Sequence, residues 1–287
     1  MKPFPIPVLA LGPGAHSQEE SLDYLPMPKD MDTYRPPALP LPEEVASRVA
    51  VRGVLRQVLA LLAQAARGQG GGQVCLRGLQ AADLQLINQL LGEGETSALV
   101  RSPEAAAELR VQESVFAGVW RLMRWEQGVS VDDAIEVGAV PAQLYAVARE
   151  DAQRPYRAWE GPLPPQVQNA PALVEEIRDR AAHWRPGEPA HVVNLTLLPV
   201  SPEDIAYLDH QLGTGRVLLL SRGYGSCRIS NTTLPHCWRV VYYNSADTVL
   251  LNSVEVVDMP EVALAAPEDL YDAHQRLLDV ARYLELA

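Results

Sequence analysis

One segment of this chain occurs twice. Residues 83–95 read DLQLINQLLGEGE, and residues 204–216 read DIAYLDHQLGTGR. Each version opens with Asp, runs through an amphipathic stretch to Leu-Gly, and closes on Gly-x-Gly before a β-prone run. Internal repetition constrains the fold strongly, because each copy must build the same supersecondary unit. The chain is therefore expected to use one unit twice.

The correspondence continues after the repeated segment. Trp120-Arg121 matches Trp238-Arg239, and Ile135-Glu136-Val137 before Pro141 matches Val254-Glu255-Val256 before Pro260. Hydrophobic periodicity and turn residues then give the same order of elements in both halves. The predicted helices are 43–67, 83–91, 141–148, 171–183, 201–212 and 267–286. The predicted strands are 74–76, 95–100, 109–115, 119–125, 131–137, 192–197, 217–222, 227–230, 237–243 and 250–257.

This order predicts an α+β fold made of two tandem copies of an α-β-α unit. In each copy an antiparallel β-meander and a closing helix follow, and a pseudo-two-fold axis relates the copies. The first repeat is placed at 43–149 and the second at 171–287, with a Pro-rich connector at 150–170. Ser201 is the expected N-cap of the second repeated helix, with Pro202 at its first position and Asp204 three residues after the cap.

The N-terminal 42 residues contain ten prolines punctuated by apolar residues. Proline fixes φ and removes a backbone donor, so this segment should be extended. We expect a strap along the folded body, and a disordered tail is the alternative.

The net charge of −12 and the pI of about 5.0 argue against general binding to nucleic acid or to an anionic membrane surface. Three cysteines show no framework spacing, which favours a reducing, cytoplasmic setting. The sequence has no secretory signal pattern and no apolar run long enough to cross a bilayer.

Catalytic and metal-binding patterns are scarce. No two of the six histidines stand three or four residues apart, and no GxSxG or SxxK motif occurs. The nearest candidate for a metal site is Cys227 and Cys237 with His236, although a metal would want shorter cysteine spacings and a fourth ligand. Strand or core cysteines are the alternative reading. We predict no catalytic residues and no cofactor.

The acidic turn that follows the first repeated helix is the most distinctive polar feature. Glu93 and Glu95 flank its glycines, whereas the second copy has Thr214 and Arg216. Nothing structural demands carboxylates there, so a cationic ligand is a reasonable hypothesis. A charged, exposed turn without function is the competing interpretation.

Several blocks of the sequence are similar to motifs of one known family. They are LGPG at 11–14, LLGEGE at 90–95, VQESVFAGVWR at 111–121, NLTLLPVS at 194–201, GYGSCRI at 223–229, TTLPHCWRVVYYN at 232–244 and LLNSVEVVDMPEVALAAPEDL at 250–270. Together, in order and over essentially the whole chain, they resemble the HupH/HyaF/HoxQ family of nickel–iron hydrogenase accessory proteins.

The resemblance implies a cytoplasmic, non-enzymatic chaperone or scaffold. Its client would be the precursor of the hydrogenase small subunit, which carries iron–sulfur clusters and a twin-arginine signal peptide. A thioredoxin-like accessory protein would be a second partner. The alternative within the same pathway is an iron–sulfur or metal carrier that uses Cys227, His236 and Cys237. An enzyme acting on a small molecule is a third hypothesis, and no motif favours it.

Partner-binding residues are our own prediction, since the resemblance supplies none. The acidic turn, Glu93 with Glu95, comes first, and Tyr224 in the glycine turn 223–225 follows. Glu261 stands in the most specific of the matching blocks. Trp120 and Trp238 occupy matched positions, where a paired core aromatic is the stronger alternative.

Overall fold

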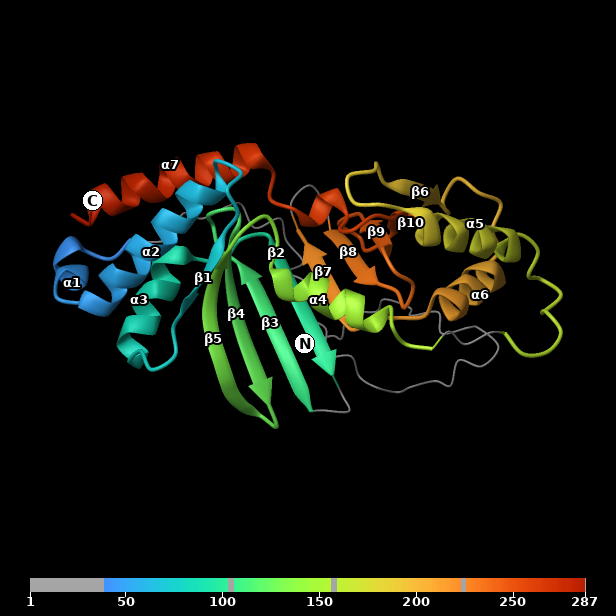
Figure 1. Ribbon diagram of the computed structural model, residues 1–287, viewed down its shortest axis with the longest axis horizontal. Coiled ribbons are helices and arrows are strands. Elements are labelled where there is room, and N and C mark those ends of the chain that lie inside the picture. Colours follow the sequence, from blue (N-terminus) through green and yellow to red (C-terminus); the bar gives the residue numbers. More distant parts are fainter. Residues whose placement is uncertain (1–38, 103–105, 156–158, 223–225, 287) are drawn as a thin grey trace. The chain divides into compact units, whose positions relative to one another are not determined.

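The structure, a computed structural model, describes residues 39–102, 106–155, 159–222 and 226–286. These residues form seven α-helices and ten strands (Figure 1). The α+β class expected from the sequence is confirmed. Tertiary contacts divide the chain into two compact units.

The first compact unit, here the α2–α7 unit, contains residues 39–146, 217–222 and 261–286 of the described chain. Its strands pair antiparallel in the order β1-β5-β4-β3-β2-β7. Its elements are α1 (Pro42–Ala46), α2 (Val49–Ala65), β1 (Gly72–Cys75), α3 (Ala81–Leu91), β2 (Thr96–Ser102), β3 (Ala107–Glu113), β4 (Val119–Glu126), β5 (Val129–Val137), β7 (Val217–Ser221), η2 (Glu261–Ala263) and α7 (Pro267–Tyr283).

The core of the α2–α7 unit lies where α2 and α7 run side by side (Figure 1). Helix α2 places Val51, Leu55, Val58 and Leu62 on one face at helical spacing, and all four are at most 3% exposed. Leu270 and Leu277 are among the residues with which α7 joins the same cluster. Burying each such side chain contributes about 1.5–3 kcal/mol, so α7 is an integral part of this unit.

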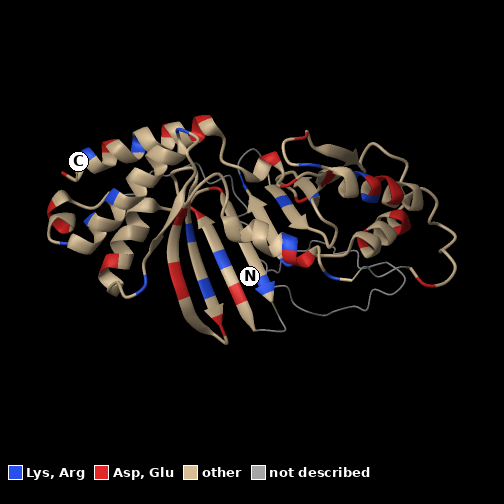
Figure 2. Ribbon diagram, in the orientation of Figure 1, with Lys and Arg blue, Asp and Glu red and all other residues tan. Residues whose placement is uncertain are grey.

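Charged residues lie along β3, β4 and β5 (Figure 2). Strand β5 carries acidic residues, the neighbouring β4 carries mainly basic residues, and β3 carries both. Arg101 pairs with Glu108 at 3.3 Å, and Arg121 makes two bonds to Asp133, at 2.6 and 2.7 Å. A sheet with one apolar and one polar face follows from alternating side chains on antiparallel strands.

The second compact unit, here the α5–α6 unit, contains residues 147–216 and 226–260 of the described chain. Its strands pair antiparallel in the order β8-β9-β10-β6. Its elements are α5 (Ala170–His183), β6 (His191–Asn194), α6 (Pro202–Leu212), β8 (Ser226–Asn231), β9 (Cys237–Tyr243) and β10 (Val249–Val256). The helix α4 (Ala142–Asp151) begins in the α2–α7 unit and ends in this one.

The N-terminus of α6 follows the sequence prediction. Ser201 is the N-cap, and its side chain accepts from the backbone N–H of Asp204 at 2.9 Å. The Asp204 carboxylate accepts in return from the backbone N–H of Ser201 at 3.0 Å, which completes a capping box. Asp204 does more than cap this helix, because its Oδ1 also accepts three backbone N–H groups at the start of α5, each at 2.9 Å. These donors are Gln168, Asn169 and Ala170.

Some element boundaries differ from the prediction. The helix expected at 43–67 is two helices, because Arg48 leaves the helical region at φ −100° and ψ 80°. The strand expected at 192–197 ends at Asn194, whose side-chain oxygen accepts from the N–H groups of Thr196 and Leu197 and turns the chain. The helix expected at 267–286 ends at Tyr283.

The compact units interleave along the sequence. Strand β7 and helix α7 come from the C-terminal half of the chain, yet β7 pairs with β2 and α7 packs on α2. The division into repeats 43–149 and 171–287 concerns repeated sequence and stays a prediction, as does the pseudo-two-fold axis. Residues 1–38 of the expected strap lie outside the described residues.

Candidate functional site

The acidic turn after α3 has a rigid backbone. Gly92 has φ 59°, which closes the helix, and Gly94 donates its N–H to the carbonyl of Glu113 at 2.7 Å. A Cβ on Gly94 would lie 2.3 Å from the Ser114 carbonyl oxygen, so only glycine fits there. The exposed side chains of Glu93 and Glu95 are therefore carried on a fixed loop.

A third carboxylate, Glu113 at the end of β3, lies beside this turn. Its Oε1 accepts from the N–H of Gly118 at 3.2 Å. Burial raises the pKa of Glu113, and the nearby carboxylates of Glu95 and Asp269 raise it further, against the lowering effect of hydrogen bonds from Gly118 and Thr96. The turn therefore belongs to a small acidic cluster of Glu95, Glu113 and Asp269.

Helix α7 brings Asp269 to this cluster. Asp269 is exposed in the first turn of the helix, where a carboxylate also complements the helix dipole. The next residue, Leu270, packs so closely on Gly118 that a Cβ there would lie 2.1 Å from Leu270 Cδ2. In the described part of the chain, no ion pair neutralises Glu95, Glu113 or Asp269.

The α5–α6 unit has a turn with matching backbone contacts after α6. Gly213 has φ 68°, and Gly215 donates its N–H to the carbonyl of Asn231 at 2.9 Å. A Cβ on Gly215 would lie 2.1 Å from the Asn231 side-chain nitrogen. Arg216 thus takes the place that Glu95 has in the other turn, and Asn231 takes the place of Glu113.

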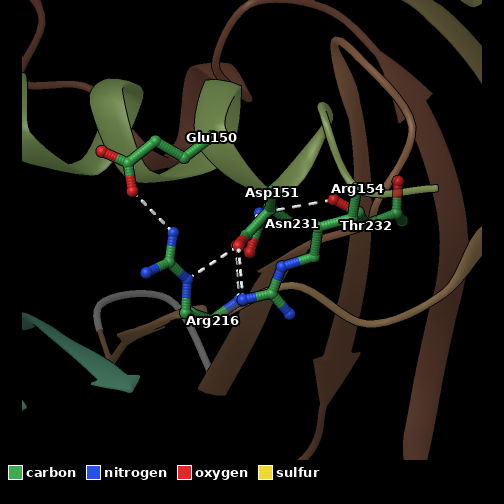
Figure 3. A network of polar contacts seen from close by, with 6 residues as sticks. All are labelled: Glu150, Asp151, Arg154, Arg216, Asn231 and Thr232. Carbon is green, nitrogen blue, oxygen red and sulfur yellow. Dashed lines mark hydrogen bonds and ion pairs between the residues drawn. The ribbon is translucent and has the colours of Figure 1, made fainter. Parts of the chain in front are cut away.

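Arg216 is held in a dense polar network (Figure 3). Its Nε donates to Asp151 Oδ1 at 2.7 Å, its backbone N–H donates to Asp151 Oδ2 at 2.7 Å, and its Nη2 donates to Glu150 Oε2 at 2.8 Å. Asn231 Nδ2 donates to Asp151 Oδ2 at 3.0 Å, and Arg154 lies 3.4 Å from Asp151 Oδ1. The end of α4 is thereby fixed to the turn after α6 and to β8.

The charges of this network compensate one another. The Asp151 side chain is fully buried and that of Arg216 is 20% exposed, whereas Glu150 is 62% exposed. Burial by itself lowers the pKa of Arg216, but hydrogen bonds to Glu150 and Asp151 and their negative charges outweigh it and raise the pKa. The buried carboxylate of Asp151 and the guanidinium of Arg216 each make several hydrogen bonds, and together they hold the end of α4 to the turn after α6. This pair is here called the structural lock.

The two matched tryptophans lie in the protein interior. Trp120 and Trp238 are each 1% exposed, and their indole N–H groups donate to the carbonyls of Gly138 at 2.9 Å and Asp258 at 3.2 Å. In this conformation neither ring is available to a partner. Glu261 is exposed at the start of η2. Tyr224 lies outside the described residues.

The cysteine and histidine candidates do not form a ligand set. Cys227 and Cys237 are buried, and burial raises their thiol pKa values to about 12 and about 11, so both are protonated at neutral pH. Metals bind the thiolate. His236 Nδ1 lies 3.4 Å from Asp258 Oδ1, and its ring packs on Trp184 at 4.6 Å. Within the described ranges, no three His, Cys, Asp or Glu side chains are arranged to hold a metal ion.

Sequence reasoning missed three of the residues that shape these sites. Glu113 and Asp269 both lie in the family-like blocks. Glu113 stands seven residues before Trp120, as Asn231 does before Trp238, and this matched spacing could have drawn attention to Glu113. Asp151 carries no local signal, because its partners Arg216 and Asn231 are 65 and 80 residues away.

Among the described helices, none has both the length and the apolar character needed to cross a membrane.

The fold and these sites define an α+β protein with two distinctive polar turns that have matching backbone contacts. The turn after α3 is acidic, and the turn after α6 carries Arg216, which binds Asp151 of the same chain. The family model for the C-terminal conserved region of the HupH hydrogenase expression protein matches residues 49–161 and again 167–284. The chain belongs to the HupH family of hydrogenase expression proteins.

Curated relatives cover nearly the whole chain. The hydrogenase expression/formation protein HoxQ of Cupriavidus necator is 48% identical over 287 residues, which is 99% of each chain. The hydrogenase expression/formation protein HupH of Rhodobacter capsulatus is 44% identical, covering 96% of this chain and 97% of its own. The hydrogenase-1 operon protein HyaF of Escherichia coli is 32% identical, covering 96% and 95%. The resemblance drawn from the sequence blocks is therefore confirmed.

Proposed function

We propose that this protein is a non-catalytic accessory protein of nickel–iron hydrogenase formation. It holds the precursor of the iron–sulfur small subunit in the cytoplasm before twin-arginine export. Support comes from full-length relatives named as hydrogenase expression/formation proteins. The observation that carries the proposal is the acidic turn of Glu93 and Glu95, fixed by Gly94 beside the additional carboxylate of Glu113.

Carboxylates on a fixed loop suit a partner that presents arginine. A carboxylate accepts two parallel hydrogen bonds from a guanidinium, and such bonds are stronger than neutral ones. A twin-arginine signal peptide carries two such groups side by side. The net charge of −12 adds a general attraction for a basic segment and speeds its encounter with the protein.

The partner set of this proposal includes a thioredoxin-like accessory protein as well as the precursor. Two copies of one unit, related by a pseudo-two-fold axis, form the scaffold. The double match of the family model and the paired turn contacts at Gly94 and Gly215 support the duplication.

Co-purification with the small-subunit precursor, with and without its signal peptide, tests the proposal. The double substitution Glu93→Lys with Glu95→Lys should weaken precursor capture without unfolding the protein, because both side chains are exposed. Unchanged capture by the double variant would remove the acidic turn from the mechanism. Equal recovery of unrelated exported proteins would refute a dedicated chaperone.

A further inference from the structure

Strand β6 forms an open edge of the sheet in the α5–α6 unit (Figure 1). Within the described residues it pairs with β10 on one side only, with Val193 opposite Val254. The N–H of Leu195 donates to the carbonyl of Asn252 at 2.9 Å, which sets the alternation of this ladder. In an antiparallel pair every second residue bonds to its partner, so the N–H and C=O of Val192 point away from β10.

Exposed aliphatic side chains surround this edge. Val192 is 52% exposed, and Leu197, in the loop that follows β6, is 79% exposed. The loop stays beside β10, because Thr196 Oγ1 accepts from the N–H of Asn252 at 2.8 Å. The other exposed aliphatic residues of the loop and of the start of β10 are Leu198, Val249 and Leu250. Clustered apolar side chains of this kind are typical of an interaction site.

The β6 edge lacks the polar residues that normally keep an edge strand from pairing with another chain. Strand β1 has the same place beside β5 in the α2–α7 unit, since the N–H of Leu76 donates to the carbonyl of Asp133 at 2.9 Å. Counted from these matched bonds, the positions of Val192, Leu197, Val249 and Leu251 are occupied there by Gln73, Gly78, Ser130 and Asp132. Segments 192–200 and 248–254 contain no charged residue. Only the β1 edge is therefore protected.

We propose that the β6 edge binds an extended, uncharged segment of a partner polypeptide, which adds as a further strand beside β6. The outward N–H and C=O of Val192 match a backbone in strand conformation, and the aliphatic side chains around them match aliphatic side chains on the partner. The inference goes beyond the proposed function, which concerns the acidic turn, and does not depend on it.

The shape of the patch favours a partner segment over a second copy of this chain. Strand β6 has four residues, because Asn194 turns the chain, so two copies of β6 paired across a two-fold axis would share only a short ladder. A stable dimer buries about 800 Å² on each partner. The exposed aliphatic residues continue past the end of β6, to Leu197 and Leu250. An extended segment of about six residues, at about 3.3 Å each, contacts these residues as well as β6.

Three uncharged hexapeptides, titrated into the full-length protein and followed by NMR, test the site. Acetyl-Val-Thr-Val-Thr-Val-Thr-amide should bind, shift the amide resonances of Val192 and Asn194, and slow hydrogen exchange of the Val192 N–H. The same peptide with every peptide nitrogen methylated should bind at least about tenfold more weakly, because it cannot donate to the β6 backbone. A peptide with serine in place of each valine should also bind about tenfold more weakly, because it lacks the aliphatic side chains.

Val192→Lys places a charge on the open edge and should weaken binding of the valine peptide by about tenfold. Gln73→Lys is the matched control on the β1 edge and should keep the affinity within about twofold of the unmodified protein. Both residues are exposed, so both variants should keep the Tm of the unmodified protein. The double substitution Glu93→Lys with Glu95→Lys should leave peptide binding unchanged, which separates this site from the acidic turn.

Three results would overturn the proposal. The first is equal binding of the methylated peptide, or no binding of the valine peptide, while the precursor is still captured; the proposed function then stands without this site. The second is an equal loss of affinity in Val192→Lys and Gln73→Lys. The third, from light scattering, is a dimer of the unmodified protein that Val192→Lys converts to monomers, because the β6 edge would then pair with a second copy of the chain.

Discussion

The Asp151→Ala substitution tests whether the lock between α4 and the turn after α6 stabilises the α5–α6 unit. The Asp151 side chain is fully buried and accepts three hydrogen bonds of 3.0 Å or less. Two come from Arg216 and one from Asn231. Alanine removes the acceptor for all three and leaves the Arg216 guanidinium with Glu150 as its remaining carboxylate partner in this network.

The expected cost follows from the burial of the pair. Breaking a buried ion pair by removing one partner costs about 3–5 kcal/mol, because the other charge is left uncompensated. The Arg216 side chain is 20% exposed and keeps its bond to Glu150, so the low end of this range applies, about 3 kcal/mol. At about 2–4 °C per kcal/mol, Tm should fall by roughly 6–12 °C.

Urea unfolding followed by far-UV circular dichroism and by tryptophan fluorescence provides the measurement. Glu150→Ala is the matched control: its side chain is 62% exposed, so its loss should cost at most about 1 kcal/mol. A double-mutant cycle of Asp151→Ala with Arg216→Ala should give a larger coupling energy than the cycle of Glu150→Ala with Arg216→Ala, since Glu150 is the more exposed partner. If Asp151→Ala loses less than about 1 kcal/mol, the structural lock described above is wrong.

Three other predictions follow from burial and charge. Glu113→Gln should raise the free energy of unfolding at pH 7. The pKa of Glu113 is raised in the folded protein, so this carboxyl stabilises the fold below its ordinary pKa of 4.5 and loses that contribution as pH rises. In thermal melts, the increase in Tm caused by Glu113→Gln should therefore vanish in acid. Asp204→Ala should lower the free energy of unfolding by about 2–3 kcal/mol near pH 7, and the difference in unfolding free energy from the unmodified protein should become smaller in acid. Burial raises the pKa of Asp204, but four backbone N–H donors outweigh this and lower it, so its contribution is present above 3.8 and lost as pH falls through the folded value. A thiol reagent counted by mass spectrometry should label exposed Cys75 in the native protein, and should reach buried Cys227 and Cys237 only after unfolding.

Local features of the fold could be predicted because the residues that determine them are neighbours in sequence. Ser201, Pro202 and Asp204 lie within one helical turn, and their capping box forms as the sequence indicates. The Gly-x-Gly turns after α3 and α6 were recognised for the same reason. The break at Arg48 within the expected helix 43–67 was missed, because the apolar spacing continues through it.

The candidate sites could be predicted only in part. The acidic turn of Glu93 and Glu95 stands out by comparison with Thr214 and Arg216. The residues that surround this turn do not stand out in the sequence, because Glu113 and Asp269 are brought beside it only by strand pairing and by the packing of α7.

The sequence by itself determined most of the order of helices and strands, the N-cap of α6 and the position of the turns after α3 and α6, since these depend on backbone preferences and contacts within a few residues. The tertiary structure alone decided that β7 and α7 join the α2–α7 unit, and that Asp151 holds Arg216 across 65 residues. Such choices depend on which surfaces bury the most apolar area and which charges find partners, and both require the whole folded chain.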